Sequence, residues 1–212
     1  MTENSSETER LLSAAAQGDN EQWGALLTRH RERLRRMVAL RLDRRLQGRI
    51  DASDVIQEAC LEASARLAEY LKQPTMPFFL WLRFLTSQKL LELHRHHLGV
   101  HARDAGREVS LYRGALPEAS SADLAAQLLG HWTRPSEAAI RAEMKIRLQD
   151  ALNNMEPLDR EVLALRHFEQ LNNAETAQTL GIQAGAASKR YLRALKKLKE
   201  ILTSMPGGIG EV

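Results

Sequence analysis

The stretch that decides the fold is LNNAETAQTLGIQAGAASKRYLRALKKLKEIL, residues 171–202. Asn172, followed three residues later by Glu175, predicts a capping box at the start of a short helix. Gly181 predicts the turn that ends this helix, and a longer helix is expected to follow up to the end of the stretch. A short helix, a tight turn and a basic second helix form the helix-turn-helix pattern.

The second helix of such a motif lies in the major groove of DNA and presents its N-terminal side chains to base edges. The predicted base or phosphate contacts are Ser188, Lys189, Leu192 and Arg193. The predicted phosphate contacts are Arg190, Lys196 and Lys197. A basic amphipathic helix that closes a helical bundle has the same pattern, so this alternative stays open.

Apolar residues also recur at three- and four-residue steps in the N-terminal half, which predicts helices there. We expect an all-α protein with two small helical domains joined by a linker. The first domain is predicted over residues 7–104 and the second over residues 136–203. Helical periodicity is lost over residues 105–135, where Gly, Pro and Ser collect, so this segment is predicted to be the linker. Within it, residues 122–129 are compatible with a short helix.

Basic residues gather in two segments although the formal net charge is only +3. Nine arginines lie between Arg29 and Arg49 against two acidic residues, and six basic residues with no acid lie between Lys189 and Lys199. Separate basic segments favour a polyanionic partner. A solvated helix face is the alternative interpretation of each segment taken alone.

Cys60 is the only cysteine, which excludes an intrachain disulfide and a cysteine-rich metal site. This usage fits a reducing cytoplasm. Residues 1–10 are polar and acidic, unlike a signal peptide, and no apolar run approaches the about 18 residues of a membrane span. We therefore expect a cytoplasmic protein without a membrane span.

A histidine cluster, His94, His96, His97 and His101, raises the question of a metal site. His97 and His101 are four residues apart, but no Glu-x-x-His pair or thiolate accompanies them. The sequence contains no P-loop, dinucleotide-binding fingerprint or nucleophile elbow. We expect no enzyme activity, no cofactor and no metal site.

Residues 51–54, Asp-Ala-Ser-Asp, predict the start of a helix with a carboxylate cap. Four polar side chains are expected to face solvent over its first turns: Asp51, Asp54, Gln57 and Glu58. Ordinary capping explains these residues equally well, so the sequence pattern alone does not assign them a partner.

A very apolar helix is predicted to begin near Met76 and to become polar toward residue 98. Trp81 and Arg83 lie in its apolar part, where an aromatic run favours core packing over base stacking. The stretch from Lys89 to Arg107 mixes arginines, including Arg95, with four histidines. That composition suits a nucleic-acid surface.

Together these segments resemble the sigma-70 family of RNA polymerase sigma factors. Two segments resemble conserved region two of the family: DASDVIQE (51–58) and FLWLR (79–83). Two others resemble region four: LNNAETAQTLGI (171–182) and SKRYLRALKKLK (188–199). Their order and spacing are similar to the extracytoplasmic-function (ECF) group, which has only these two domains. Two segments further resemble a subgroup common in planctomycetes: MPFFLWLRFLT (76–86) and ASKRYLRAL (187–195).

The resemblance implies a role for each segment. Asp51, Asp54, Gln57 and Glu58 match the region that docks on the clamp helices of the polymerase large subunit. The part that melts and reads the minus-ten element is matched by Trp81, Arg83, Gln88 and the following helix with Lys89 and Arg95. Gln88 matches a position in the loop that captures a flipped base, where many relatives have Asn. Residues 188–197 match the minus-thirty-five recognition helix.

The resemblance therefore implies a sigma factor that binds core RNA polymerase and directs promoter recognition, DNA melting and transcription initiation. Its expected partners are core polymerase and promoter DNA, both as duplex and as melted single strand; an anti-sigma factor or other regulator stays open. Two alternatives remain from the residues alone. The chain could act as a stand-alone helix-turn-helix transcription regulator, or as a helical adaptor whose basic faces bind acidic proteins.

Overall fold

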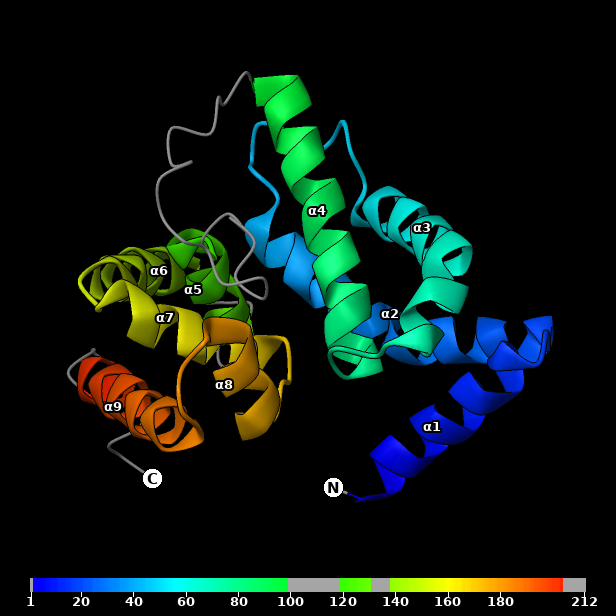
Figure 1. Ribbon diagram of the computed structural model, residues 1–212. Helices are drawn as coiled ribbons and strands as arrows, with labels where there is room; N and C mark the ends of the chain where they lie inside the picture. Colours follow the sequence, from blue (N-terminus) through cyan, green and yellow to red (C-terminus); the bar gives the residue numbers. More distant parts are fainter. Residues whose placement is uncertain (1, 99–118, 131–137, 204–212) are drawn as a thin grey trace. The chain divides into compact units, whose positions relative to one another are not determined.

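The computed structural model describes residues 2–98, 119–130 and 138–203 (Figure 1). Every secondary-structure element in these ranges is helical, so the all-α prediction is confirmed. The chain divides into two compact units, residues 1–116 and residues 117–212. Each unit is described by itself below.

The first unit contains four helices: α1 (Thr2–Ala16), α2 (Asn20–Arg41), α3 (Ala52–Lys72) and α4 (Phe78–Leu98). Helix α3 packs along α4, and α2 contacts both of them, while α1 packs on α2. The side chains that fill this core are fully buried and recur at helical spacing: Leu26, Leu34, Met37 and Val38 from α2, Val55, Ile56 and Ala59 from α3, and Leu82, Leu85 and Leu90 from α4.

Carboxylate caps fix the starts of α2 and α3. Asp19 accepts hydrogen bonds of 3.0 Å from the backbone N–H groups of Glu21 and Gln22. Asp51 accepts a 2.8 Å hydrogen bond from the N–H of Ser53, which confirms the predicted helix start. Before α3 the chain turns at Gly48, whose φ of 94° favours glycine.

The aromatic run at the start of α4 lies in the core, as the packing interpretation expected. Phe78 contacts Trp23 edge-on, with ring centroids 5.9 Å apart. Trp81 stacks on Tyr70 of α3 at 4.4 Å, and the Tyr70 hydroxyl donates a 2.9 Å hydrogen bond to the carbonyl of Met76. These contacts fasten α4 to α2 and α3 at one end of the unit.

The second unit contains α5 (Ser121–Gly130), α6 (Ala138–Asn153), α7 (Pro157–Leu163), the π-helical turn η1 (Ala164–Phe168), α8 (Asn173–Leu180) and α9 (Ala184–Thr203). Helix α9 packs against α7, α8 and α6. Helix α5 falls inside the segment predicted as a linker. It packs on α6, with Leu124 and Leu129 fully buried. The alternative of a short helix within that segment is therefore confirmed.

The predicted helix-turn-helix forms with the expected local chemistry. The side chain of Asn172 accepts a 2.9 Å hydrogen bond from the N–H of Glu175. The Glu175 carboxylate accepts one of 2.8 Å from the N–H of Asn172, so the capping box is complete. Gly181 ends α8 in the left-handed conformation, with φ 62° and ψ 35°.

Candidate nucleic-acid interface

Helix α9 has one buried side and one exposed side. Ala187, Ala194 and Leu198 are buried at seven- and four-residue spacings, and they face α7 and α8 within the unit. Lys189 and Leu192 lie on the opposite side and are exposed. The helix therefore offers one cationic surface to solvent while its small residues let it pack closely.

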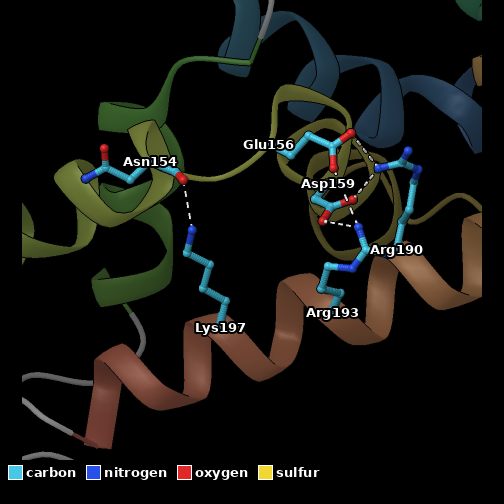
Figure 2. A network of polar contacts seen from close by, with 6 residues as sticks. All are labelled: Asn154, Glu156, Asp159, Arg190, Arg193 and Lys197. Atoms are coloured by element: carbon cyan, nitrogen blue, oxygen red, sulfur yellow. Dashed lines mark hydrogen bonds and ion pairs between the residues drawn. The ribbon is translucent and has the colours of Figure 1, made fainter.

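Two carboxylates, one at the N-cap of α7 and one within that helix, hold α9 in place (Figure 2). Arg190 donates hydrogen bonds of 2.7 Å to Asp159 and 2.9 Å to Glu156. Arg193 donates one of 3.3 Å to the second oxygen of Asp159 and lies 3.5 Å from Glu156. The Asp159 side chain is only 6% exposed. The hydrogen bonds to Asp159 and Glu156 raise the pKa of Arg190 above its ordinary value, as expected for charge-assisted bonds.

Lys197 makes a further bond across the unit. Its Nζ donates a 2.8 Å hydrogen bond to the backbone carbonyl of Asn154, just beyond α6 (Figure 2). Arg190, Arg193 and Lys197 were predicted to contact DNA, and the structure gives each of them a partner in its own unit. Contact with DNA would have to compete with these bonds.

The first turn of α9 is tied to the first turn of α8. Ser188 donates a 3.0 Å hydrogen bond to the side-chain oxygen of Asn173, and the Asn173 amide donates one of 2.9 Å to the carbonyl of Ala184. Sequence reasoning missed Asn173 because nothing in the local pattern distinguishes it from the capping residue beside it. The bond fixes the angle between the two helices of the motif.

The four residues predicted to bind polymerase are all exposed on the first turns of α3: Asp51, Asp54, Gln57 and Glu58. Leu61, one turn further along the same face, is 65% exposed and was not predicted. An open hollow of about 460 Å³ beside Asp51 and Asp54 is lined in part by Leu42 and Ile50. Acids, amides and apolar groups thus share one accessible face.

Two predicted DNA contacts on α4 lie in the core. Trp81 is 7% exposed and Arg83 is 3% exposed. Side chains with so little accessible surface have no room for DNA in this fold, so their prediction as DNA contacts is not supported. Sequence reasoning had placed them by resemblance although the apolar pattern around them indicated packing.

The remaining residues predicted on α4 are accessible. Gln88 is exposed and lies within the continuous helix Phe78–Leu98. This confirms the helix predicted from Met76, whereas the family position that Gln88 matches lies in a loop. Lys89 is half-buried between Glu62 and Glu92, 3.3 Å from each carboxylate, and hydrogen bonds to Glu92 and Glu62 raise its pKa. Arg95 is exposed near the end of the helix.

The described part of the histidine cluster does not gather into a metal site. His94 Nε2 accepts a 3.3 Å hydrogen bond from the backbone N–H of Asp43, and burial lowers the pKa of His94. Among the described residues no group of three His, Cys, Asp or Glu side chains could hold a metal ion. His101 lies outside the described residues.

Known proteins that resemble this chain include RNA polymerase sigma factors. The family Sigma-70, region 4 matches residues 145–198, which include α7, α8 and most of α9. ECF RNA polymerase sigma factor SigD of Mycobacterium tuberculosis is 28% identical over 200 residues, covering 94% of this chain and 86% of SigD. This chain is an RNA polymerase sigma factor. Relatives named ECF RNA polymerase sigma factors cover 94% and 91% of this sigma factor.

Two further matches extend over both units of the sigma factor. RNA polymerase sigma factor NccH of Alcaligenes xylosoxydans xylosoxydans is 27% identical over 198 residues, covering 92% of this chain and 95% of NccH. A solved structure of CnrH in complex with the cytosolic domain of CnrY has a TM-score of 0.54 at 21% identity, over 94% of this chain and 99% of the matched chain. That match supports the helical fold. In the described ranges, no helix is long and apolar enough to cross a membrane.

Proposed function

We propose that this sigma factor docks on core RNA polymerase through the exposed face of α3 and reads the upstream promoter element with α9. The observation that carries the proposal is the helix-turn-helix of the second unit. Its first helix is capped, its turn is set by Gly181, and its second helix turns a cationic side to solvent. Major-groove recognition needs a helix that projects from a rigid support in this way.

Docking on polymerase is assigned to Asp54, Gln57, Glu58 and the neighbouring Leu61. An exposed leucine surrounded by charged and amide groups fits a protein interface, where an apolar centre is rimmed by polar side chains. Asp51 also caps α3, so its role in docking is coupled to the stability of the helix start.

The minus-ten element is assigned to the accessible side of α4, at Gln88, Lys89 and Arg95. Single-stranded DNA binds to proteins through cationic groups along the backbone and through pockets for unstacked bases. Lys89 would exchange its bonds to Glu62 and Glu92 for a phosphate, so this contact would be weaker than that of an unrestrained lysine. Duplex promoter DNA and its melted strand are thus both proposed as partners.

The functional domains are proposed to extend over residues 7–104 and 136–203; within the segment 105–135 between them, α5 packs on α6 of the second unit. Two weak DNA-binding units on one chain gain affinity by effective concentration, and core polymerase would set their separation. The proposed role is binding without catalysis. Because a subunit of the polymerase works where the chromosome is, we propose a cytoplasmic protein. The segments 76–86 and 187–195 support the proposal that it belongs to the planctomycete-like subgroup.

A regulatory partner is a further part of the proposal. The structural neighbour CnrH was solved with the cytosolic domain of CnrY bound to it. We propose that a regulator of the anti-sigma type similarly binds this chain and blocks its access to polymerase.

The proposal is tested by measuring promoter binding of the purified chain with and without core polymerase. Weak binding alone and strong, specific binding with core enzyme are expected, because the two units need the polymerase to hold them at promoter spacing. Tight, sequence-specific binding by the isolated chain would instead favour a stand-alone transcription regulator.

A further inference from the structure

One apolar side chain interrupts the cationic surface of α9. Leu192 is 65% exposed. The exposed residues three or four positions from it are Ser188, Lys189 and Lys196, and Lys199 follows two turns after Leu192 on the same side. Glu200 is the only acidic residue within α9, and its carboxylate lies 4.0 Å from Lys196. The result is an exposed leucine with a lysine one turn before it and another one turn after it.

The bonds on the other side of α9 hold this surface outward. Arg190 is bound to Asp159 of α7 and to the N-cap residue Glu156, and Lys197 is bound to the carbonyl of Asn154. Rotation of α9 that buried Leu192 would break these contacts and expose Ala194, which is 1% exposed. Leu192 is therefore fixed in a solvent-facing position.

The start of α9, which precedes this leucine, carries only small side chains. Ala184, Gly185 and Ala186, in the first turn of α9, are exposed and small. A Cβ placed on Gly185 would meet nothing within 4 Å. A helix that begins with small side chains and then presents a leucine between lysines fits the major groove of DNA. Phosphates line the edges of this groove, and the thymine C5-methyl is the apolar group among its base edges.

We infer that Leu192 is a specificity-determining residue that contacts a thymine methyl in the upstream promoter element. The inference rests on the proposed function and deepens it. Lys189, Lys196 and Lys199 supply affinity that does not depend on sequence, whereas the contact of Leu192 with a methyl group depends on which base is present. Ser188 contributes less to base reading because its hydroxyl is bonded to Asn173.

The test replaces each thymine of a selected promoter by deoxyuridine, which removes only the C5-methyl group. Affinities of the holoenzyme for these duplexes are compared for the wild-type chain and for Leu192→Ala. One upstream position should lose about fourfold in affinity with the wild-type chain, the value of one buried methyl group. The same replacement should have no effect with Leu192→Ala, while Leu192→Met should keep the sensitivity.

Ile146→Ala is the matched control, because Ile146 is 62% exposed on α6 of the same unit. It should respond to deoxyuridine as the wild-type chain does. Wild-type holoenzyme that binds a promoter but ignores every deoxyuridine replacement would overturn the inference alone, as would sensitivity that survives in Leu192→Ala. Failure of the holoenzyme to bind any promoter would instead remove the proposed function on which the inference rests. If Leu192→Ala weakened binding to a protein partner but left DNA binding unchanged, both the inference and the promoter-reading role of α9 would be overturned.

Discussion

The guanidinium of Arg190 lies 2.7 Å from the buried carboxylate of Asp159 and joins α9 to α7 across 31 residues of sequence. The same carboxylate accepts a bond from Arg193 through its second oxygen. This acidic side chain thus contributes two of the contacts that orient the helix that we assign to promoter reading.

Asp159→Ala should destabilise the second unit by about 1–3 kcal/mol, since it leaves a partly buried arginine with fewer acceptors. The free energy of unfolding is measured by urea titration monitored in that unit. Asp150→Ala is the control, because Asp150 is exposed on α6, and it should change stability by less than about 0.5 kcal/mol. Equal effects of the two substitutions would contradict the role of Asp159.

Lysines on the two sides of α9 should respond differently to salt. Lys189→Ala and Lys196→Ala should each lower the slope of log affinity against log salt concentration by about 1, because each removes one phosphate contact. Lys197→Ala should leave the slope unchanged, since its Nζ is bonded to the carbonyl of Asn154. The measurement is holoenzyme binding to one promoter over a range of salt concentrations. A reduced slope in Lys197→Ala would show that this lysine contacts DNA after all.

Asn172→Ala should cost about 1 kcal/mol of unfolding free energy, because it removes the acceptor of the N-terminal cap of α8. Asn172→Ser keeps a capping oxygen and should recover most of that loss. Thermal unfolding of both variants compares them directly. Similar losses in the Ala and Ser variants would indicate that the cap itself is unimportant.

Local features of this kind were predictable from the sequence, whereas contacts between distant segments were not. The capping box at Asn172 and the turn at Gly181 follow from neighbouring residues whose chemistry is decided within one helical turn. The partner of Arg190 could not be predicted, because Glu156 and Asp159 become its neighbours only when α7 and α9 pack. The sequence showed a basic run, and the fold divided it into cations bound inside the unit and cations directed outward.

The first unit gives a similar comparison. The burial of Trp81 followed from the apolar pattern, but the resemblance also assigned this residue to DNA, and the packing against Tyr70 decides between the two. The resemblance matched Gln88 to a loop position, whereas the residue pattern from Met76 onward predicted the helix that the structure has. Exposed residues such as Asp54 were placed correctly on a solvent-facing side, since an amphipathic pattern fixes that side without knowledge of the partner.

Asp54→Ala should leave folding intact and weaken binding to core polymerase, because Asp54 is exposed at the start of α3. Glu69→Ala makes the same charge change near the other end of that helix and serves as the control. Affinity for core enzyme is measured by fluorescence anisotropy with labelled chain. A folded Asp54→Ala variant with unchanged affinity would rule out the docking assignment for this residue.

Acid should destabilise the first unit through His30. Burial lowers the pKa of His30 to about 4, and its ring contacts those of Phe78 and Phe79, with centroid distances of 5.7 and 5.3 Å. The unfolded chain binds a proton near pH 6.5 and the folded chain does not. Stability present above pH 6.5 is therefore lost as the pH falls toward 4, by at most about 3 kcal/mol.

His30→Phe removes this titrating group and should reduce the loss of unfolding free energy between pH 6.5 and 4. Urea titrations at several pH values give the difference between the variant and the wild-type chain, which cancels the contribution of other groups. An identical pH dependence in the two proteins would show that His30 is not the source of the acid sensitivity.

The central claim is that this chain brings core polymerase to promoters, and in vitro transcription tests it most directly. Core enzyme is incubated with a genomic promoter library, with and without the purified chain, and RNA start sites are mapped. The account predicts a set of new start sites that share an upstream and a minus-ten sequence at fixed spacing and depend on Asp54 and Leu192. A start-site profile identical to that of core enzyme alone would contradict it.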